Sequence, residues 1–539
     1  MTRRYLQTLA VLFFITLLVQ CARRGSPTGG PKDETPPVLI SANPTSGTTN
    51  FKAKKIRFVF DELVVTKDLR KQLIISPPFE NFPLISPTSA SRWLEITITD
   101  TLSPNTTYVM NFGNSIQDYN EGNPYPFFKY VFSTGDFIDS LDVKGRIEDA
   151  FSPKPDNFVS VMLYEYNEAY SDSLVYKQRP LYVTNTLDSL TTFEIGNVRP
   201  GKYVLIGLKD KNNNYLFNQK EDKIAFSDSI ITVGEDSLAI AHTLRLFKEI
   251  RDYKATRPSQ VADNRIIFGF EGQSELAEIT PISAVTDDFK SFITKEPQKD
   301  TLNYWYRPKQ NDSIVFTVRG GTKIDTFKVR LKEMKPDSMQ LSTTFSGNLP
   351  FGKVFGWKSN TPIVKTDSTK VAIFTKDSLS VPFTTRLEPD HLQFSLLFEP
   401  KHNEQYRIEA LPEAITDFFG QTNDTLNVSL RTKKYEDYAV LKMNINMPMQ
   451  FPAILQLTNE KGDTVEQELI VKEARNEYLF ENVNPGKYRF RIIFDTNDNG
   501  RWDTGNFLQR LQPEWIFYHK NLIELRANWE VEEDFIRSE

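Results

Sequence analysis

The sequence contains little of what most enzymes use. Its 539 residues include one cysteine, Cys21, so no intramolecular disulfide can form and the fold must rely on buried apolar cores. The four histidines, His242, His391, His402 and His519, are scattered. No H-E-x-x-H, G-x-S-x-G or phosphate-loop pattern is present. We therefore predict no catalytic site and no enzymatic activity.

An excess of charge of one sign is also missing. The chain has 65 Lys and Arg against 70 Asp and Glu, a net charge of -5, and the two signs are well mixed. A nucleic-acid-binding protein would show a basic stripe or patch, so we expect no nucleic-acid partner. Beyond the N-terminus, no apolar run is long enough to predict a transmembrane helix.

The N-terminus does carry one apolar run. Arg3 and Arg4 precede the apolar stretch Leu6–Gln20, and Cys21 follows directly. This pattern predicts an export signal over residues 1–20. Leu18–Cys21, "LVQC", resembles the lipobox of bacterial lipoproteins, which implies cleavage before Cys21 and its acylation by fatty acid such as palmitate. A plain signal peptide or an uncleaved anchor is the alternative.

Residues 21–36 are rich in Gly, Pro and Ser and predict a flexible tether. With a lipid on Cys21, the chain would be attached to a membrane of the cell envelope. Arg23 and Arg24 follow the cysteine, where surface-exported lipoproteins of this type carry acidic residues. The predicted location is therefore the outer membrane, facing the periplasm.

The rest of the chain alternates between apolar and polar residues with a period of two. Lys54–Phe60, Lys202–Leu208 and Lys487–Phe494 are examples, and turn residues separate such runs. Sustained helical amphipathicity is almost absent. The pattern predicts an all-β fold of several sandwiches in a row.

Two pairs of segments repeat in the same order. Asn197–Asn218 aligns with Asn482–Asp503 at a shift of 285 residues, and Thr107–Pro126 aligns with Gln405–Asp424 at a shift of 299 between Asp118 and Asp417. We infer a duplicated two-domain unit, with an additional β segment around residues 265–335 between the copies.

Each repeat carries a tyrosine just after a turn. In Pro200–Tyr203 and Pro485–Tyr488, "PGKY", the Pro-Gly pair predicts a type II turn with the glycine at positive φ. Leu102–Tyr108 and Phe398–Tyr406 have asparagine in place of the glycine. We expect each tyrosine to bond back across a sandwich corner and to stabilise the fold.

These motifs resemble known families. Pro36–Asp136, with "IRFVFDELV", "LSPNTTYVMNF" and "YVFSTGD", resembles the bacterial Ig-like domain first named for an S-layer protein (SbsA-type), and residues 392–432 resemble a weaker second copy without a clear "F-D-E" strand. The "PGKY…D-x-N-x-N-G" units resemble transthyretin-like or carboxypeptidase-regulatory sandwiches. "PTGGPKDETPP" is similar to runs in Bacteroidetes lipoproteins. The resemblance implies a structural or binding role without a reaction.

The expected domains follow from these repeats. They are a signal peptide (1–20), a tether (21–36), a bacterial Ig-like domain (37–136), a transthyretin-like sandwich (137–248), a central β domain (258–347), a second, divergent Ig-like domain (348–435) and a second transthyretin-like sandwich (436–530).

One loop has the spacing of a calcium site. In "DTNDNGRWD", Asp495, Asn497, Asn499 and Asp503 take positions 1, 3, 5 and 9, Gly500 takes position 6, and Arg501 offers its carbonyl at position 7. A metal-free polar turn is the alternative, because position 12 is not a glutamate. The first copy has a weaker set of candidate ligands: Asp210, Asn212, Asn214, Asn218 and Glu221.

Two further features are candidates for binding or modification. Trp305 and Trp515 lie in aromatic runs that could be exposed platforms for sugar rings. Asp followed by Ser or Thr and then a small or aliphatic residue resembles a Bacteroidetes O-glycosylation motif, but Asp-Ser and Asp-Thr pairs also cap turns. These pairs begin at Asp100, Asp139, Asp172, Asp188, Asp228, Asp236, Asp300, Asp312, Asp337, Asp367, Asp377, Asp424 and Asp463.

The sequence therefore predicts a non-enzymatic, lipid-anchored envelope protein of tandem sandwiches that spaces or binds an envelope protein or glycan. Calcium is its one candidate cofactor. Two alternatives remain at this point: a carbohydrate-binding lipoprotein of a glycan-uptake system, and a calcium-dependent hydrolase.

Overall fold

The computed structural model describes residues 33–187, 191–234, 241–272, 277–283, 285–296, 299–310, 312–321 and 323–537. The predicted signal peptide, Cys21, most of the tether, Asp188 and Asp236 lie outside the described residues. The chain divides into two compact units, one ending at Ser140 and the other beginning at Leu141. Within the described ranges, no helix is long and apolar enough to cross a membrane.

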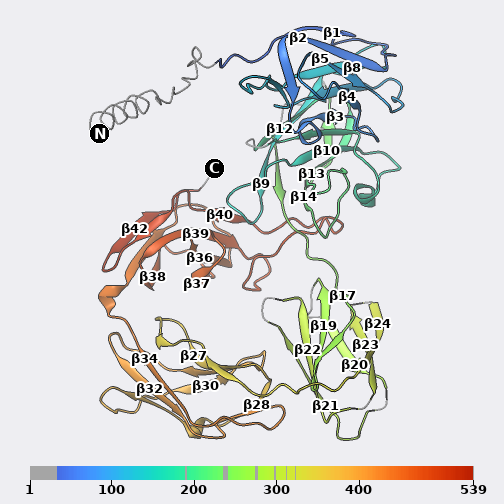
Figure 1. Ribbon diagram of the computed structural model, residues 1–539. Helices are drawn as coiled ribbons and strands as arrows, with labels where there is room; N and C mark the ends of the chain where they lie inside the picture. Colours follow the sequence, from blue (N-terminus) through green and yellow to red (C-terminus); the bar gives the residue numbers. More distant parts are fainter. Residues whose placement is uncertain are drawn as a thin grey trace, which may run out of the picture. The chain divides into compact units, whose positions relative to one another are not determined.

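The first unit is a sandwich of two antiparallel sheets (Figure 1). One sheet has the order β1-β2-β5-β4, with β7 also on β2, and the other has the order β3-β6-β8. Ile56, Phe58 and Phe60 alternate along β2 and are buried, as the period-two pattern predicts. The elements are β1 (Leu39–Asn43), β2 (Lys55–Thr66), α2 (Leu69–Gln72), β3 (Ile74–Ser76), β4 (Leu84–Ser86), β5 (Ser91–Thr97), β6 (Thr107–Asn111), β7 (Ile116–Asp118) and β8 (Lys129–Ser133).

The second unit begins with one small sandwich and ends with another. We call them the first and the second small sandwich. In the first, the sheets are β11-β10-β13-β14, with β15 on β13, and β12-β9-β16. Its elements are β9 (Leu141–Asp149), β10 (Ser160–Glu165), η1 (Asp172–Tyr176), β11 (Tyr182–Asn185), β12 (Thr192–Val198), β13 (Gly201–Lys209), β14 (Lys223–Phe226), β15 (Ile231–Val233) and β16 (His242–Leu246).

The second small sandwich repeats this topology strand for strand. Its sheets are β37-β36-β39-β40, with β41 on β39, and β38-β35-β42, and the last strand is parallel to its neighbour in both copies. Its elements are η3 (Tyr435–Asp437), β35 (Ala439–Asn444), β36 (Ala453–Asn459), β37 (Val465–Val471), β38 (Glu477–Val483), β39 (Gly486–Phe494), β40 (Ile516–Tyr518), β41 (Ile523–Leu525) and β42 (Glu530–Asp534).

Between them lies a central pair of sheets, β17-β19-β22-β21 with β18 on β19, and β20-β23-β24. These strands form around a core that includes Phe268, Tyr304 and Phe316. The strands are β17 (Lys254–Ala255), β18 (Ser259–Ala262), β19 (Arg265–Glu271), β20 (Ala277–Pro281), β21 (Lys290–Lys295), β22 (Thr301–Arg307), β23 (Ser313–Gly320) and β24 (Lys323–Arg330).

The next sandwich has the strand order of the first unit, since β25-β27-β31-β30 corresponds to β1-β2-β5-β4. The long strand β2 is here divided into β27 and β28, because Pro362 between them cannot donate a ladder hydrogen bond. The elements are β25 (Leu341–Thr343), β26 (Gly347–Asn348), β27 (Phe355–Ser359), β28 (Ile363–Thr366), η2 (Ser368–Lys370), β29 (Val371–Thr375), β30 (Thr384–Leu387), β31 (Gln393–Leu397), β32 (Gln405–Ala410), β33 (Ile415–Asp417) and β34 (Leu426–Arg431).

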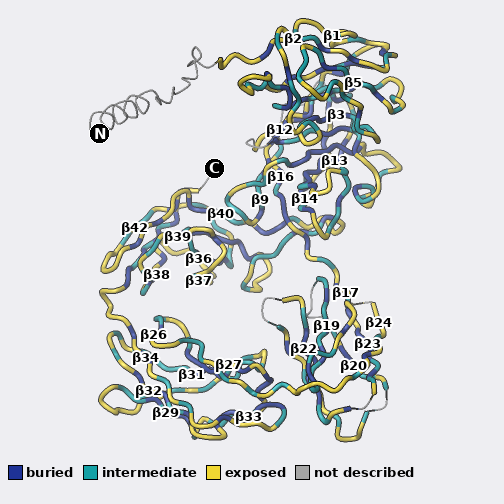
Figure 2. The backbone as a smooth tube through the Cα atoms, viewed as in Figure 1, coloured by how far each residue is buried: buried dark blue, intermediate teal, exposed yellow. Residues whose placement is uncertain are grey.

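The described chain is thus all-β, as predicted. Buried residues are concentrated in the strands, and exposed residues dominate the connections (Figure 2). Each sandwich has its own cluster of buried apolar side chains. Residues Asp33 and Thr35, which the sequence placed in the tether, contact the first sandwich, where the Asn123 amide donates to the Asp33 carbonyl at 2.9 Å.

The tyrosine corners of the small sandwiches are confirmed, but their turns differ from the prediction. Tyr203 donates to the Arg199 carbonyl at 2.9 Å and Tyr488 to the Asn484 carbonyl at 2.6 Å. Neither glycine of "PGKY" has a positive φ; Asn197 and Asn482 take that conformation instead. A Cβ on Gly201 or Gly486 would lie 3.2–3.4 Å from the tyrosine ring, so the glycine makes room for the ring.

The corners of the first unit and of the sandwich formed by β25–β34 follow the prediction. The Ser103 N–H donates to the Tyr108 hydroxyl at 2.9 Å, and the Lys401 N–H donates to the Tyr406 hydroxyl at 2.7 Å. The preceding Asn105 has a φ of 50°. Asparagine tolerates this left-handed conformation better than most residues, which explains its use in place of glycine.

A buried aspartate closes the turn after β7. The Asp118 carboxylate accepts the N–H groups of Glu121, Gly122 and Asn123 at 2.7, 3.0 and 2.8 Å. Burial opposes its ionisation, but these backbone donors outweigh that effect and hold the pKa of Asp118 below its ordinary value.

We expect Asp118→Asn to destabilise the first unit by about 1–3 kcal/mol at neutral pH, because hydrogen bonds to a charged acceptor are lost. Since the folded-state pKa is lowered, this stability is present above the unfolded-state value of about 3.9 and is lost as the pH falls through the folded-state pKa. Hydrogen-exchange protection of β6 in the full chain, with the exposed Asp136→Asn as control, measures the difference. A gap between Asp118→Asn and wild type that does not shrink in acid would contradict this account.

Candidate functional site

The two Asp/Asn loops follow equivalent strands, β13 and β39, and have the same backbone conformation. Asn213 and Asp498, at the fourth position, have φ values of 52° and 57°. Tyr215 and Gly500, at the sixth, have φ values of 59° and 74°. Glycine takes this conformation without strain, whereas a tyrosine pays a steric cost there. The first loop therefore keeps the bend without the residue best suited to it.

In the second loop the predicted ligands lie close together. Asp495 is fully buried, and its carboxylate accepts the N–H groups of Asn499 at 3.1 Å and Gly500 at 2.8 Å. The side-chain amides of Asn497 and Asn499 both donate to the same Asp503 oxygen at 2.5 Å. Arg501 lies at the rim, with its side chain 3.6 Å from Asp503. Positions 1, 3, 5 and 9 therefore belong to one hydrogen-bonded loop.

The first loop is closed differently. Asp210 accepts the N–H groups of Asn212 at 3.0 Å and Tyr215 at 2.7 Å. The Asn214 side chain accepts the Leu216 N–H, and the Asn218 amide donates to the Leu216 carbonyl. The pKa of Asp210 is raised above its ordinary value, chiefly by burial and further by nearby Asp222. The hydrogen bond from the Tyr215 N–H acts in the opposite direction but does not outweigh them.

Glu221, the predicted ligand at position 12 of this loop, is exposed. No group of three or more His, Cys, Asp or Glu side chains is placed to hold a metal ion anywhere in the described residues. A cation in either loop would therefore depend on amide and backbone oxygens as well as carboxylates.

Sequence reasoning missed a second buried acid in each loop. Asp222 accepts the N–H groups of Lys211 and Asn218 at 2.9 and 2.8 Å. Glu514 accepts those of Thr496 and Asp503 at 2.6 and 3.0 Å. Because Thr496 and Asp503 are the aligned counterparts of Lys211 and Asn218, the two acids occupy the same place. The sequence alignment does not match Asp222 with Glu514, because the loop before Glu514 is longer than the loop before Asp222.

That difference of seven residues is an insertion within Thr504–Gln512, a segment that we call the arm. Four positions separate Asn218 from Asp222, whereas eleven separate Asp503 from Glu514. The extra residues do not pack on their own sandwich. They reach the first small sandwich, more than 250 residues earlier in the chain.

Phe507 anchors the arm. Its side chain is fully buried, with its ring 5.4 Å from that of Phe226, and its N–H donates to the Glu249 carboxylate at 2.6 Å. A Cβ on Gly505 would lie 2.6 Å from the Leu511 carbonyl oxygen, within the arm itself, and 2.8 Å from the Phe247 ring. A small residue is therefore required at Gly505 for the arm to dock.

Polar contacts surround this anchor. Arg510 forms an ion pair with Asp172, with its Nε 3.0 Å from the carboxylate. Gln512 donates to the Phe226 carbonyl at 2.9 Å and to Asp228 at 2.7 Å. Asp172 and Asp228 both begin Asp-Ser pairs of the glycosylation-like motif, so at these two positions the acid serves a tertiary contact.

A second contact joins the same two sandwiches at Phe151. The ring of Trp502 lies 4.9 Å from that of Phe151, and the guanidinium of Arg491 lies 5.0 Å above it. The Tyr518 hydroxyl donates to the Phe151 carbonyl. Arg491 is buried and donates to Gln456 at 2.7 Å, so Phe151 covers a cation held within the second small sandwich.

The structure corrects the expected aromatic platforms. Trp305 is only 1% exposed and donates its indole N–H to Thr294 at 2.9 Å. It lies on the face of β22 opposite the core residues Tyr304 and Tyr306, with its ring 6.2 Å from that of Phe419 in the next sandwich, so it cannot stack on a sugar. Trp515 is 38% exposed, but the Arg245 guanidinium lies 3.6 Å from its ring and Phe517 stacks on it at 5.7 Å. Burial lowers the pKa of Arg245 to about 10. The aromatic runs therefore serve packing.

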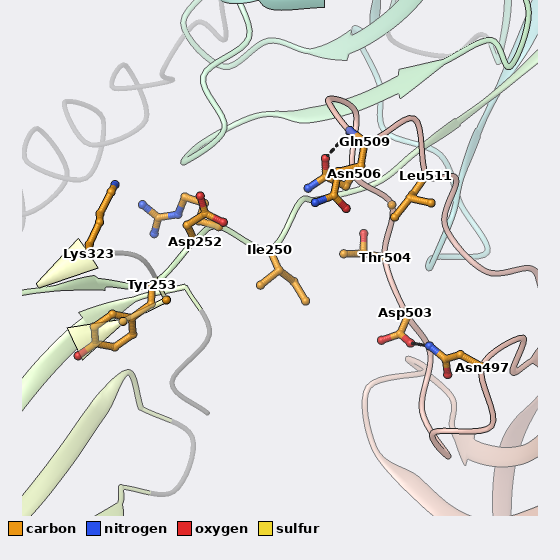
Figure 3. A pocket seen from close by; sticks show the side chains of 14 residues that line it. Ile250, Asp252, Tyr253, Lys323, Asn497, Asp503, Thr504, Asn506, Gln509 and Leu511 are labelled. Carbon is orange, nitrogen blue, oxygen red and sulfur yellow. Dashed lines mark hydrogen bonds between the residues drawn. The ribbon is translucent and has the colours of Figure 1, made fainter. Parts of the chain in front are cut away.

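A cavity of about 580 Å³ lies beside the arm. Figure 3 shows Asp503 and Asn497 on one side, Ile250 and Asp252 from the segment after β16, and Lys323 beyond them. Its lining is mixed polar and apolar, and Asp503 is already bonded to Asn497. The cavity thus adjoins the Asp/Asn loop, the arm and the central domain.

Comparison with known proteins supports part of the expected family. Residues 33–134 match the model of the bacterial Ig-like domain. No curated protein matches the chain. Domains 4–9 of the surface layer protein SbsC are 9% identical, with 80% of this chain and 64% of that chain covered and a TM-score of 0.19. The human desmocollin-1 ectodomain is 10% identical, with 88% and 95% covered and a TM-score of 0.15.

The chain covers 65% of the length of an SbsC fragment with domains 1–6, at 11% identity and a TM-score of 0.14. Scores this low carry no argument about function. The residues that carry the likeness to a family are therefore 33–134, which resemble a bacterial Ig-like domain.

The two tryptophans should differ in their effect on stability. Trp305→Ala should lower the free energy of unfolding of the central domain by about 3–5 kcal/mol, because a buried ring is removed and Thr294 loses its partner. Trp515→Ala should cost less, because its ring is partly exposed. Thermal unfolding of both variants measures this, and equal losses would contradict the assigned burial.

Proposed function

We propose that this chain is a non-enzymatic, lipid-anchored protein of the cell envelope with a structural or binding role. The observation that carries the proposal is the architecture: a bacterial Ig-like domain followed by a duplicated set of sandwiches whose small members bind each other through Phe507. A series of sandwiches can present binding surfaces along its length. The expected location on the periplasmic side of the outer membrane belongs to the same proposal.

The use of the buried acids supports a structural role over hydrolysis. A catalytic carboxylate must direct an oxygen at a substrate or at a water. In the second Asp/Asn loop, Asp495 and Glu514 instead use both oxygens to accept backbone N–H groups of their own loop. Such groups organise a turn, and removing them would disturb the fold rather than a reaction step.

The lipid anchor is tested at Cys21. We expect wild-type protein to incorporate labelled palmitate and to sediment with membranes, because acyl chains partition into the bilayer. Cys21→Ser should lose the label and leave the membrane fraction while keeping its fold. Unlabelled wild-type protein would contradict the anchor without affecting the sandwich assignment.

We further propose that the second Asp/Asn loop binds one Ca²⁺ for rigidity. The convergence of Asn497, Asn499 and Asp503 supports this, since a cation there would replace two amide-to-carboxylate hydrogen bonds. The first loop, with Asp210, Asn212, Asn214, Asn218 and Glu221, is the weaker candidate because Tyr215 stands in place of the glycine.

Calcium at roughly 10 mM should stabilise the second small sandwich by about 1–3 kcal/mol, for dissociation constants of about 10⁻⁴–10⁻³ M. Asp503→Asn should abolish the response and keep the backbone bonds made by Asp495, whereas exposed Asp463→Asn should respond as wild type. Thermal unfolding with and without Ca²⁺ provides the measurement. An equal response to Mg²⁺, or one retained in Asp503→Asn, would refute the site.

A further inference from the structure

We propose that the arm is a detachable strap, which docks on the first small sandwich and can leave it while both sandwiches remain folded. When docked, it closes the chain between Glu249 and Phe507, 258 residues apart, into a loop. When released, it leaves the two small sandwiches folded and joined by the contact at Phe151 and by Arg245 against Trp515, so the contact area between them shrinks without unfolding. The proposal depends on neither the lipid anchor nor calcium.

The arm contributes nothing to the core of its own sandwich. That core consists of residues from β35–β42 and their connections, and it includes Leu455, Phe480 and Phe490 but no arm residue. The aligned loop of the first small sandwich lacks the insertion and still supports the same topology. The second sandwich is therefore complete without the arm, so release need not unfold it.

The socket that receives the arm is organised by the first small sandwich alone. The rings of Phe226 and Phe247 meet edge to face at 6.0 Å. Glu249 is buried, and its second oxygen accepts the Gln219 amide at 2.7 Å. The Asp172 carboxylate accepts the Tyr170 hydroxyl at 2.9 Å. The first small sandwich thus holds in place the Phe226 and Phe247 rings for the Phe507 side chain. It also holds the Glu249 carboxylate for the Phe507 N–H and the Asp172 carboxylate for Arg510.

The composition of the contact favours reversible docking. One buried aromatic side chain, Phe507, is surrounded by charged and polar contacts, and Arg510 and Asp172 remain 36% and 26% exposed. Ion pairs with this exposure are screened by salt. Release would leave Glu249 hydrated and bonded to Gln219, so its carboxylate would not be buried without a partner. Docking is intramolecular, which maintains a high effective concentration of the arm.

Hydrogen exchange of the arm in the full chain tests the strap. The Phe507 N–H is protected only while bonded to Glu249, so its exchange reports release, whereas β39 reports unfolding of the sandwich. We expect the arm to exchange much faster than β39 in wild-type protein, and faster still at higher salt. Exchange of the arm at the rate of β39 would overturn the proposal, because the arm would then be a permanent part of the fold.

A charge swap tests the contact. Arg510→Asp should accelerate exchange of the arm on the order of tenfold, because two carboxylates would then face each other. The pair Arg510→Asp with Asp172→Arg should restore slow exchange, and Arg526→Asp on the same sandwich should change nothing. The exchange of β39 should stay constant throughout. Absence of rescue by the pair, or loss of β39 protection in Arg510→Asp, would refute the assigned contact.

A chemical cross-link tests whether closure occurs within one chain. Asp172 and Arg510 meet through the length of the arginine side chain, so cysteines at these positions need a short bifunctional maleimide rather than a disulfide to join them. Asp172→Cys with Arg510→Cys, with Cys21 replaced by serine, should give a monomeric cross-link that suppresses exchange of the arm. A cross-linked dimer would show that the arm fills the socket of a second copy and would overturn closure within one chain.

Discussion

Backbone N–H groups at strand ends have no ladder partner, and when they are buried they must be satisfied in some other way. This chain satisfies them with buried carboxylates. Asp118 does so in the first unit, Asp210 and Asp222 in the first small sandwich, and Asp495 and Glu514 in the second. Since no intramolecular disulfide is possible, the loops are held in place by these buried carboxylates and by packing against the apolar cores.

The same constraint explains how a loop could acquire a new role. The two carboxylates at either end of the Asp/Asn loop bind its backbone in both small sandwiches, so residues between the last two anchor points can be added without disturbing the strands. The insertion falls within Thr504–Gln512, between Asp503 and Glu514, where such an addition is tolerated. Duplication supplied two similar sandwiches, and the longer loop of the second one connects them.

Much of the architecture could be predicted because β-sandwich cores impose a period of two on the sequence. Alternation along β2, β13 and β39 and the shift of 285 residues between the small sandwiches indicated an all-β fold and a repeat. The tyrosine corners were predictable from "PGKY" and "LSPNTTY", since their hydrogen bonds are local. The positive φ was misplaced in the small sandwiches, because the packing of Tyr203 and Tyr488 against the glycines is not visible in turn statistics.

The sequence by itself determined the local features of this protein: strands, corners, and the spacing of Asp495, Asn497, Asn499 and Asp503. These depend on contacts between residues near each other in the chain. Only the tertiary structure decided that Trp305 is buried near Phe419 of the next sandwich, that Glu514 closes the second loop, and that Phe507 and Arg510 dock on Phe226 and Asp172. Burial and pairing across more than 250 residues depend on how separate sandwiches pack against each other. The periodicity of the sequence reports which residues face the core of one sandwich, but not which sandwiches come into contact.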